Sequence, residues 1–385
     1  MKIATVLVDR ANYGRLKPLM RALAEHHEMS VICAGSMVLD RFKRPADDVE
    51  ADGFKVVERL HTSVEGATLA TGVRSIAAAV TEFSGALDRN PSDYVLIIGD
   101  RQEALGAAIA AAYLHRSIIH VQGGEVSGSL DESARHAITK LSHWHVPATE
   151  AARRRIVQMG ESPDTILAVG CPSSDLAKGI PLEPSGRIMC QYHPDTHYPE
   201  RAAWEVEQIF ESLRAGGVDW FWPNIDAGSG AVHKSLRRLR DRHRRNWTYH
   251  TNLPPEDYYR MLAGASLAVG NSSSFVRDSG YWGTPVVLVG SRQDGRECGA
   301  NVLRVDCVPE NIRMANAYQF GKRHDPSTLY GDGNVCQRIV DRLAEVRPYH
   351  VKRFCDGHSG GDPGAQREQG DTGQEHAGDL RAVAD

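Results

Sequence analysis

Three carboxylate side chains stand where apolar runs of the sequence give way to polar ones, and crowded carboxylates can do acid–base chemistry. Asp100 follows the run Ile97-Ile-Gly, Glu125 follows Val121-Gln-Gly-Gly, and Asp131 begins the segment Asp-Glu-Ser-Ala-Arg-His. Because like charges repel within one pocket, the pKa of at least one such carboxyl rises toward the range of a general acid or base. Helix capping alone could explain Asp100 and Asp131, but it does not explain Glu125. We therefore predict that the three carboxylates act together in catalysis.

A second group of residues has the composition of an anion site. Three consecutive serines, Ser272–Ser274, follow an apolar run and precede Arg277. Hydroxyls and free backbone N–H groups at the start of a helix bind anions, although a plain serine cap would explain the same residues. Arg10 and His193 each follow another apolar run, so both are expected to face the same cleft. The sequence therefore predicts an anion site together with a carboxylate cluster.

These residues must be positioned by short apolar runs that alternate with longer amphipathic segments. Runs such as Val95-Leu-Ile-Ile are apolar on both faces, as strands are in a parallel sheet that helices cover. In the first half of the chain we expect strands at 3–8, 30–34, 54–59, 94–99, 118–122, 143–147 and 166–169, and helices at 16–25, 71–88, 103–113, 132–141 and 150–159. In the second half we expect strands at 188–192, 220–222, 247–249, 267–270, 286–289 and 301–305, and helices at 200–214, 255–263, 275–282 and 335–346. This alternation predicts an α/β fold with two Rossmann-like domains around a central cleft.

The chain of 385 residues is long enough for two domains, and a proline-rich segment marks the expected boundary. Residues 172–186 contain three prolines and two glycines, which interrupt the strand–helix rhythm. We predict one domain over 1–172, which carries the carboxylates, and a second over 187–334. The last residues, 356–385, hold seven acidic side chains, two arginines and seven glycines. Because they have almost no large apolar side chains, we predict a disordered tail.

The charge of the chain argues against nucleic acid as a partner. Lysine and arginine total 45 and aspartate and glutamate total 49, a net charge of −4, and the tail with its seven acidic residues and two arginines accounts for all of this negative charge. The body is therefore nearly neutral, and the basic run 234–245 lacks the interleaved aromatics of a nucleic-acid site, so it indicates a solvated helix face. No apolar stretch reaches the ~18 residues of a membrane span. The N-terminus has no leader-like segment, and we expect a cytoplasmic protein.

Patterns for a metal or a bound cofactor are weak. The first turn, Asp9-Arg-Ala-Asn-Tyr-Gly, lacks the glycine spacing of a dinucleotide site, and His233 stands where a phosphate-binding loop requires glycine. His143 and His145 share one face of an expected strand, but no third ligand follows at a recognised metal spacing. The seven cysteines are widely spaced without a C-x-x-C pair, which predicts free buried thiols. We therefore expect neither a metal nor a cofactor.

Six ordered motifs between residues 1 and 350 carry a specific resemblance to a known family. They are Gly99-Asp-Arg-Gln-Glu-Ala, Gln122-Gly-Gly-Glu-Val-Ser-Gly, Asp131-Glu-Ser-Ala-Arg-His, Tyr192-His-Pro, Pro223-Asn-Ile-Asp-Ala-Gly-Ser and Gly270-Asn-Ser-Ser-Ser. The chain resembles the UDP-N-acetylglucosamine 2-epimerases, most closely their hydrolysing, sialic-acid-pathway branch. The resemblance implies a glycosyltransferase-B-like fold, no NAD, and a homodimer or a dimer of dimers. It also implies that a final helix, within 335–355, crosses back onto the first domain, and that 187–334 binds the nucleotide.

The resemblance also implies roles for individual residues. The positions implicated in catalysis are Asp100, Glu125, Asp131 and His193. The positions expected to bind the UDP-sugar are Arg10, Arg135, His136, Asn224, Ser272, Ser273, Ser274, Arg277 and Asp278. The chain departs from the family at Asn12, which replaces an aspartate, at Phe275, which replaces a glycine, and at Asp278, which replaces a glutamate. Phe275 is expected to narrow the pocket, and the shorter Asp278 is expected to shift the ribose contact or to reach it through water.

The implied reaction is an inversion at C2 of UDP-N-acetylglucosamine through a 2-acetamidoglucal. Addition of water to the glycal gives N-acetylmannosamine and UDP, whereas return of UDP gives UDP-N-acetylmannosamine. The sequence leaves open both outcomes, and it also leaves open a related UDP-diacetamido-trideoxyhexose as the substrate. A glycosyltransferase of the same fold, or a silent nucleotide-sugar sensor, are the alternative classes, but the carboxylate cluster favours an epimerase.

Overall fold

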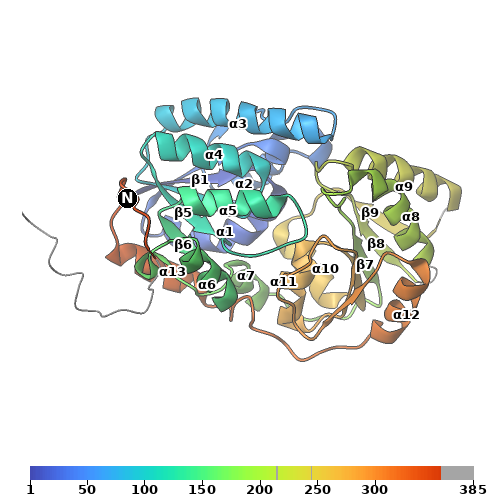
Figure 1. Ribbon diagram of the computed structural model, residues 1–385. Coiled ribbons are helices and arrows are strands. Elements are labelled where there is room, and N and C mark those ends of the chain that lie inside the picture. The colour runs from blue at the N-terminus through green and yellow to red at the C-terminus, as the bar shows by residue number, and fades with distance from the viewer. Residues whose placement is uncertain (214–215, 244, 357–385) are drawn as a thin grey trace, which may run out of the picture.

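The computed structural model describes residues 1–213, 216–243 and 245–356, and within these residues the strands form two six-stranded sheets (Figure 1). All strand pairs in both sheets are parallel. The predicted disordered tail lies outside the described residues except for Asp356. The predicted fold class, two Rossmann-like α/β units, is therefore confirmed.

The first sheet has the strand order β3-β2-β1-β4-β5-β6. Its strands are β1 (Lys2–Leu7), β2 (Glu28–Cys33), β3 (Val56–Arg59), β4 (Tyr94–Ile98), β5 (Ser117–Val121) and β6 (Trp144–Val146). The helices of this half are α1 (Arg10–Ala24), α2 (Pro45–Ala51), α3 (Leu69–Arg89), α4 (Gln102–Tyr113), α5 (Asp131–Leu141), α6 (Glu150–Gln158) and α7 (Ser173–Lys178). Every residue of β4 and β5 is buried, because helices cover both faces of the sheet. This is why these strands are continuous apolar runs in the sequence.

The second sheet has the strand order β12-β11-β10-β7-β8-β9. Its strands are β7 (Ile188–Gln191), β8 (Val218–Phe221), β9 (Trp247–His250), β10 (Leu267–Gly270), β11 (Val286–Val289) and β12 (Val302–Val305). The helices of this half are α8 (Ala202–Ser212), α9 (Ser229–His243), α10 (Pro255–Gly264), α11 (Ser273–Arg277) and α12 (Pro309–Gln319). Residues 234–243 of the basic run lie on α9, whose apolar face is buried while its arginines are exposed, as predicted. Arg245 follows the helix and donates to the carbonyls of Phe210 and Leu213.

Both sheets repeat one topology, which determines where a ligand can bind. Counting strands from the start of each half, the order in each sheet is 3-2-1-4-5-6, the arrangement of dinucleotide-binding folds. In such sheets the chain leaves the first and fourth strands in opposite directions, which opens a crevice at their carboxyl ends. The crevice is therefore expected at the carboxyl ends of β1 and β4 in the first sheet, and at those of β7 and β10 in the second.

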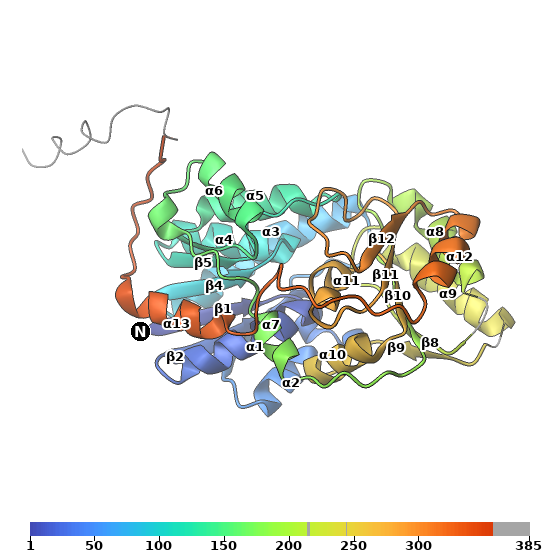
Figure 2. The ribbon, with the colours of Figure 1, turned by 90° about the horizontal axis from the view of Figure 1, so that it is seen from below.

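The last helix, α13 (Val335–Glu345), packs on the first half of the chain rather than on the second, which precedes it in the sequence (Figure 2). Ile339 and Leu343 are buried with Leu16 and Leu19 of α1 in one apolar cluster. Beyond α13, the Lys352 ammonium donates hydrogen bonds to three backbone carbonyls at the end of α5. The described C-terminal segment is therefore part of the structure around the first sheet.

Four details of the predicted secondary structure are wrong. Residues 166–169 form a single bridge, between His145 and Ile166, instead of a strand. The expected helix 275–282 is the short α11 followed by one 3₁₀ turn over Ser279–Trp282. Helices α2 and α12 were not expected. Helix α7, inside the segment 172–186, was not expected either, whereas the domain boundary that we place in this segment stays a prediction.

No helix among the described residues is both long enough and apolar enough to cross a membrane.

The packing of α13 gives a first test of this fold. Ile339→Ala should lower the free energy of unfolding by about 2–5 kcal/mol, because Ile339 is only 1% exposed in the core of the first half. Urea unfolding, followed by circular dichroism, measures the change. As a control, Val351→Ala should change stability by less than ~0.5 kcal/mol, since Val351 is 75% exposed. Equal effects of the two substitutions would contradict the docking of α13.

Candidate active site

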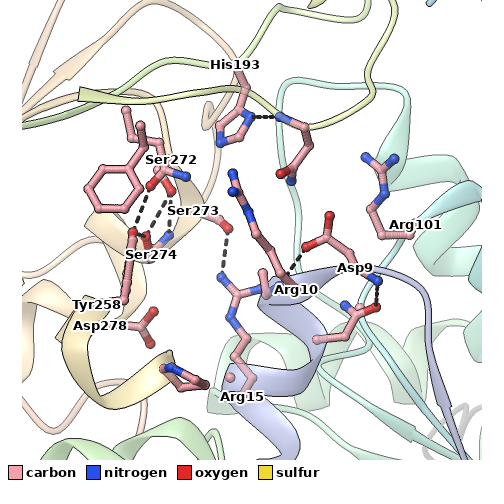
Figure 3. A pocket seen from close by; sticks show the side chains of 18 of the residues that line it. Asp9, Arg10, Arg15, Arg101, His193, Tyr258, Ser272, Ser273, Ser274 and Asp278 are labelled. Atoms are coloured by element: carbon pink, nitrogen blue, oxygen red, sulfur yellow. Dashed lines mark hydrogen bonds between the residues drawn. The ribbon is translucent and has the colours of Figure 1, made fainter. Parts of the chain in front are cut away.

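A cavity lies between the carboxyl ends of the two sheets and is lined by side chains from both (Figure 3). The start of α1 and the loop after β4 line it from the first half, and the loops after β7, β8 and β10 line it from the second. Nine of the thirteen predicted site residues line this cavity: Arg10, Asp100, Asp131, His193, Asn224, Ser272, Ser273, Ser274 and Asp278. The other four, Glu125, Arg135, His136 and Arg277, do not.

Arg10 brings a buried cation into the centre of the cavity. It is the first residue of α1, which begins there because the Asp9 carboxylate accepts the N–H of Ala11 and the Asn12 side chain accepts the N–H of Asp9. The Arg10 side chain extends toward His193 (Figure 3). Its Nη2 donates to the carbonyl of Trp222 at 2.9 Å, but its buried Nη1 has no hydrogen-bond partner. Because an unpaired buried donor is costly, Nη1 is available to an anionic ligand.

The three serines lie opposite Arg10 at the start of α11. Ser272 caps this helix, because its hydroxyl oxygen accepts the backbone N–H of Ser274 at 3.4 Å, so the capping interpretation is correct. Ser273 instead accepts a hydrogen bond from Arg15 Nη2 at 2.9 Å. Arg15 belongs to the first half of the chain, so this contact crosses the cleft. The buried Tyr258 hydroxyl contacts Ser274 and donates to Gln191 at 2.8 Å.

Asp100 is a carboxylate that its surroundings keep ionised. It follows β4 but does not cap α4, which begins two residues later with Arg101 at the cap. The buried guanidinium of Arg135 donates to one Asp100 oxygen. Burial raises the pKa of Asp100, but the positive charges of Arg135, Arg296 and Arg277 outweigh burial and hold that pKa below its ordinary value. Arg135 therefore acts on the site through Asp100, although it does not line the cavity.

Asp131 has the opposite electrostatic environment. It is the first residue of α5, and one of its oxygens accepts the Ser129 hydroxyl at 3.2 Å. Burial, and next the negative charges of Asp100 and Asp226, raise the pKa of Asp131 to about 6, despite the opposing charge of Arg292. A carboxyl with this pKa is a suitable general acid or base near neutral pH.

A chain of charges links Asp131 to the second half of the chain. Arg292 Nη2 lies 3.6 Å from an Asp131 oxygen and 3.7 Å from an Asp226 oxygen. Asp226 in turn pairs with Arg101 of the first half. Burial raises the pKa of Asp226, but Arg101 and Arg292 outweigh burial and hold it below its ordinary value. Asp226 therefore remains an anion between two arginines.

His193 presents a neutral imidazole to the cavity. Burial, and next the charge of Arg292, lower the pKa of His193 to about 3. Its Nδ1 accepts the backbone N–H of Asn224 at 3.4 Å, so the proton of the neutral ring is on Nε2. Asn271 fixes the His193 backbone through two hydrogen bonds, of 2.7 and 2.8 Å. The ring can therefore donate a hydrogen bond from Nε2.

Glu125 lies outside the cavity, in a buried ionic cluster between the two halves. One oxygen pairs with Arg277 and the other lies 3.4 Å from Arg296 Nη1. All three side chains are at most 4% exposed. Glu125 in this arrangement holds the second half against the first, and its assignment to catalysis stays a prediction.

Other predicted positions also differ from their expected surroundings. His136 lies on α5 with Nε2 3.8 Å from Glu132, away from the cavity. Phe275 is fully buried in an apolar cluster with Tyr259 and Leu262, so the expectation that it narrows the pocket is wrong. Asp278 lines the cavity and accepts the Ser173 hydroxyl at 3.0 Å.

Several polar residues that line or border the cavity are not among the predicted site residues. Arg15, Tyr258 and Arg292 line it, as do Asp9, Asn12, Arg101, Gln191, Asn252 and Tyr259, and Asp226 borders it through its contacts with Arg101 and Arg292. Asp226 lies within a motif that was noted, Pro223-Asn-Ile-Asp, and a count of polar residues after each strand would have found it. Arg15 and Tyr258 lie inside helices, where a polar residue usually indicates a solvated face.

The described residues form neither a metal-binding cluster nor a disulfide. No group of three or more histidine, cysteine, aspartate or glutamate side chains that could hold a metal occurs among the described residues. His143 Nδ1 accepts a backbone N–H, and His145 Nε2 pairs with Glu161 at 3.1 Å, so the two imidazoles have separate partners. All seven cysteines are free thiols, as predicted, and all but Cys298 and Cys355 are buried.

Comparison with known proteins gives one consistent family. Residues 21–344 match the family described as UDP-N-acetylglucosamine 2-epimerase. The chain is 29% identical to the UDP-N,N'-diacetylbacillosamine 2-epimerase (hydrolyzing) of Legionella pneumophila, over 91% of this chain and 97% of that protein. It is also 29% identical to a UDP-N-acetylglucosamine 2-epimerase of Neisseria meningitidis serogroup B, over 90% of this chain and 94% of that protein.

Solved structures agree on the fold. A UDP-GlcNAc 2-epimerase from Neisseria meningitidis, bound to UDP-GlcNAc, superposes with a TM-score of 0.74 at 16% identity. The superposition covers 90% of this chain and all of that one. The two-sheet architecture is therefore the glycosyltransferase-B-like arrangement that the resemblance implied.

The raised pKa of Asp131 predicts a pH-dependent stability effect. The folded state favours the neutral carboxyl, so ionisation destabilises it as the pH rises through about 6. Asp131→Asn should therefore raise the melting temperature relative to the unsubstituted protein at pH 8, and this gain should shrink toward pH 5. Differential scanning calorimetry between these pH values measures the difference. A gain that does not vary with pH would contradict the raised pKa.

Proposed function

The chain belongs to the UDP-N-acetylglucosamine 2-epimerase family, and we propose that it inverts C2 of a UDP-linked 2-acetamido sugar and releases the free sugar by hydrolysis. The observation that carries this proposal is the pairing, within one cavity, of an unpartnered Arg10 guanidinium nitrogen with the Asp131 carboxyl of raised pKa. The Arg10 guanidinium can bind a diphosphate, and the Asp131 carboxyl can take a proton from a carbon atom of the sugar.

The diphosphate binds between Arg10 and the serines of α11. Arg10 Nη1 donates to a phosphate oxygen, and Arg15 brings a second positive charge through its contact with Ser273. The uridine extends toward Tyr258 and Asp278, which line the same end of the cavity. This placement leaves the anomeric carbon facing Asp100 and Asp131.

The first chemical step is an elimination. The Asp131 carboxylate takes the C2 hydrogen as a proton, the C2–H electrons form the C1=C2 double bond, and the C1–O bond breaks with its electrons on the departing UDP. Arg10 and the Nε2–H of His193 stabilise the charge that develops on the leaving phosphate. Asp131 is preferred as the base because the pairing of Asp100 with Arg135 makes Asp100 a weaker one.

Hydrolysis follows when water adds to the glycal. The water oxygen bonds to C1, one of its protons is released, and a proton is delivered to C2 on the face opposite to that of removal. The products are UDP and a free sugar inverted at C2. Hydrolysis is preferred over return of UDP because the Legionella pneumophila relative, similar over nearly its whole length, is named as hydrolysing.

A time course in deuterium oxide tests the mechanism. Incubation with UDP-N-acetylglucosamine should release UDP and N-acetylmannosamine that carries deuterium at C2, because the hydrogen delivered to the opposite face of C2 comes from solvent or from a group that exchanges with it. Asp131→Asn should lower the rate by ~10²-fold or more, since the amide cannot accept the proton. Proton NMR follows the C2 signal and the products together.

The matched control is Asp40→Asn, at an exposed aspartate outside the cavity, which should retain normal turnover. A product that keeps the original proton at C2 would contradict the proposed removal of this proton and its replacement from the opposite face. Full activity in Asp131→Asn would remove Asp131 from the mechanism.

The anion site has its own test. Arg10→Ala should weaken UDP binding by about 10- to 150-fold, because it removes a charged hydrogen-bond donor worth ~1.5–3 kcal/mol. Isothermal titration calorimetry with UDP measures the affinity. Arg21→Ala on the same helix is the control, since Arg21 is 53% exposed and should leave the affinity unchanged. If Arg10→Ala binds UDP normally, the nucleotide lies elsewhere.

A further inference from the structure

A second cavity adjoins the candidate active site. Arg101 and Asp131 line both cavities, and the second extends from them between α3, the start of α5 and the loop after β8. Segments of both halves line it, and next to this lining the N–H of Gly228 donates to the carbonyl of Ala67 at 3.0 Å. This contact places the start of α3 beside the start of α9 (Figure 1). We call this second cavity the side pocket.

Several polar atoms that line the side pocket are buried and have no hydrogen-bond partner. They are the Ser63 hydroxyl, Arg101 Nε, one oxygen of Glu103 and one oxygen of Asp226. The side chains of Glu103 and Asp226 are only 2% and 3% exposed. Their free oxygens have only ionic contacts of 3.7 Å, with Arg101 and Arg292. Buried polar atoms left without partners are costly, and in folded proteins ordered water commonly supplies the missing hydrogen bonds.

Water fits the side pocket in both size and chemistry. The volume of the pocket is about 270 Å³, whereas one buried water needs only ~10–15 Å³ of such space. A water molecule can donate to the free oxygens of Glu103 and Asp226, and it can accept from Arg101 Nε. The remaining walls are apolar and include Leu69, Val73, Ile76, Leu130, Ala134 and Ile225. Because these walls offer no hydrogen bonds, the waters bind at the polar atoms.

A bound substrate closes the other route by which water could reach the reacting carbon. The inference rests on the proposed function, which places the diphosphate between Arg10 and the serines of α11 and turns C1 of the sugar toward Asp131. The UDP-sugar then fills the first cavity, so water that adds to C1 while UDP remains bound must come from another side. The side pocket meets the first cavity at Arg101 and Asp131, and its waters therefore lie next to the sugar.

We propose that the side pocket supplies the water that hydrates the glycal, and that Glu103 positions these waters and accepts the proton that hydration releases. The oxygen of one water bonds to C1. The electrons of the C1=C2 bond form the new C2–H bond with a proton delivered on the face opposite to that of removal. The surplus proton of the water passes along the neighbouring waters to the Glu103 carboxylate, and from there it returns to solvent.

Glu103 is better suited to accept this proton than Asp226, the other buried carboxylate with a free oxygen. Burial raises the pKa of Glu103, and the charge of Arg101 opposes this rise without cancelling it. At Asp226 the charges of Arg101 and Arg292 instead outweigh burial and hold the pKa below its ordinary value. The carboxylate with the higher pKa is the stronger base. Glu103 does not line the first cavity, so it acts on the substrate only through water.

Separate measurement of the two half-reactions tests this role. The first is the release of UDP from UDP-N-acetylglucosamine in a single turnover, and the second is the hydration of added 2-acetamidoglucal in the presence of UDP. Proton NMR follows both. Glu103→Gln should slow hydration by about 10²-fold, because the amide cannot accept the proton, whereas it should change UDP release by less than about threefold. Free 2-acetamidoglucal should then accumulate from UDP-N-acetylglucosamine.

A second variant tests the pocket without changing a charged or polar group. Ala134→Leu places a larger side chain in the lining, so it should displace waters and slow hydration by about tenfold while UDP release persists. Ala137→Leu, on the same helix but outside the lining, should leave both rates unchanged. Unchanged hydration in Glu103→Gln, or equal slowing of both half-reactions in the two variants, would overturn the assignment. Absence of both half-reactions in the unsubstituted enzyme would instead refute the proposed function.

Discussion

The arrangement of the site depends on the pairing of buried charges across the cleft. Asp226 of the second half pairs with Arg101 of the first, and Arg292 of the second half approaches Asp131 of the first. Each of these groups would be costly to bury alone, because an ion that leaves water without a partner loses its solvation. The two halves therefore satisfy each other's charges only when they face each other across the cleft.

Charge pairing also gives the carboxyl groups of Asp100, Asp131 and Glu125 different electrostatic surroundings. Arg135 holds Asp100 in the ionised form, whereas burial and neighbouring anions raise the pKa of Asp131 to about 6. Glu125 is occupied by Arg277 and Arg296 between the two halves. One carboxyl thus has a pKa raised to about 6, one is held ionised, and one pairs with arginines between the two halves. Environment, and not residue type, separates these roles.

The repeated fold explains why such a site can form. Each half has the strand order that opens a crevice beside its first strand, so the two crevices combine into one cavity when the halves face each other. One crevice supplies Asp100 and Asp131, and the other supplies His193 and the serines before α11. A second cavity, which shares Arg101 and Asp131 with the first, extends the same boundary and is lined by segments from both halves.

The sequence by itself determined the fold class, most strands and nine of the residues that line the cavity, because apolar runs and the polar residues that follow them are local signals. Runs such as β4, buried on both faces, predict a parallel sheet, and Asp100 and Ser272 follow such runs directly. The tertiary structure alone decided which polar residues share a cavity and which pair with each other. Glu125 looks like Asp131 in the sequence, but two arginines more than 150 residues away remove it from the cavity. Such partners are set by how the two sheets pack, and no local pattern of residues encodes that packing.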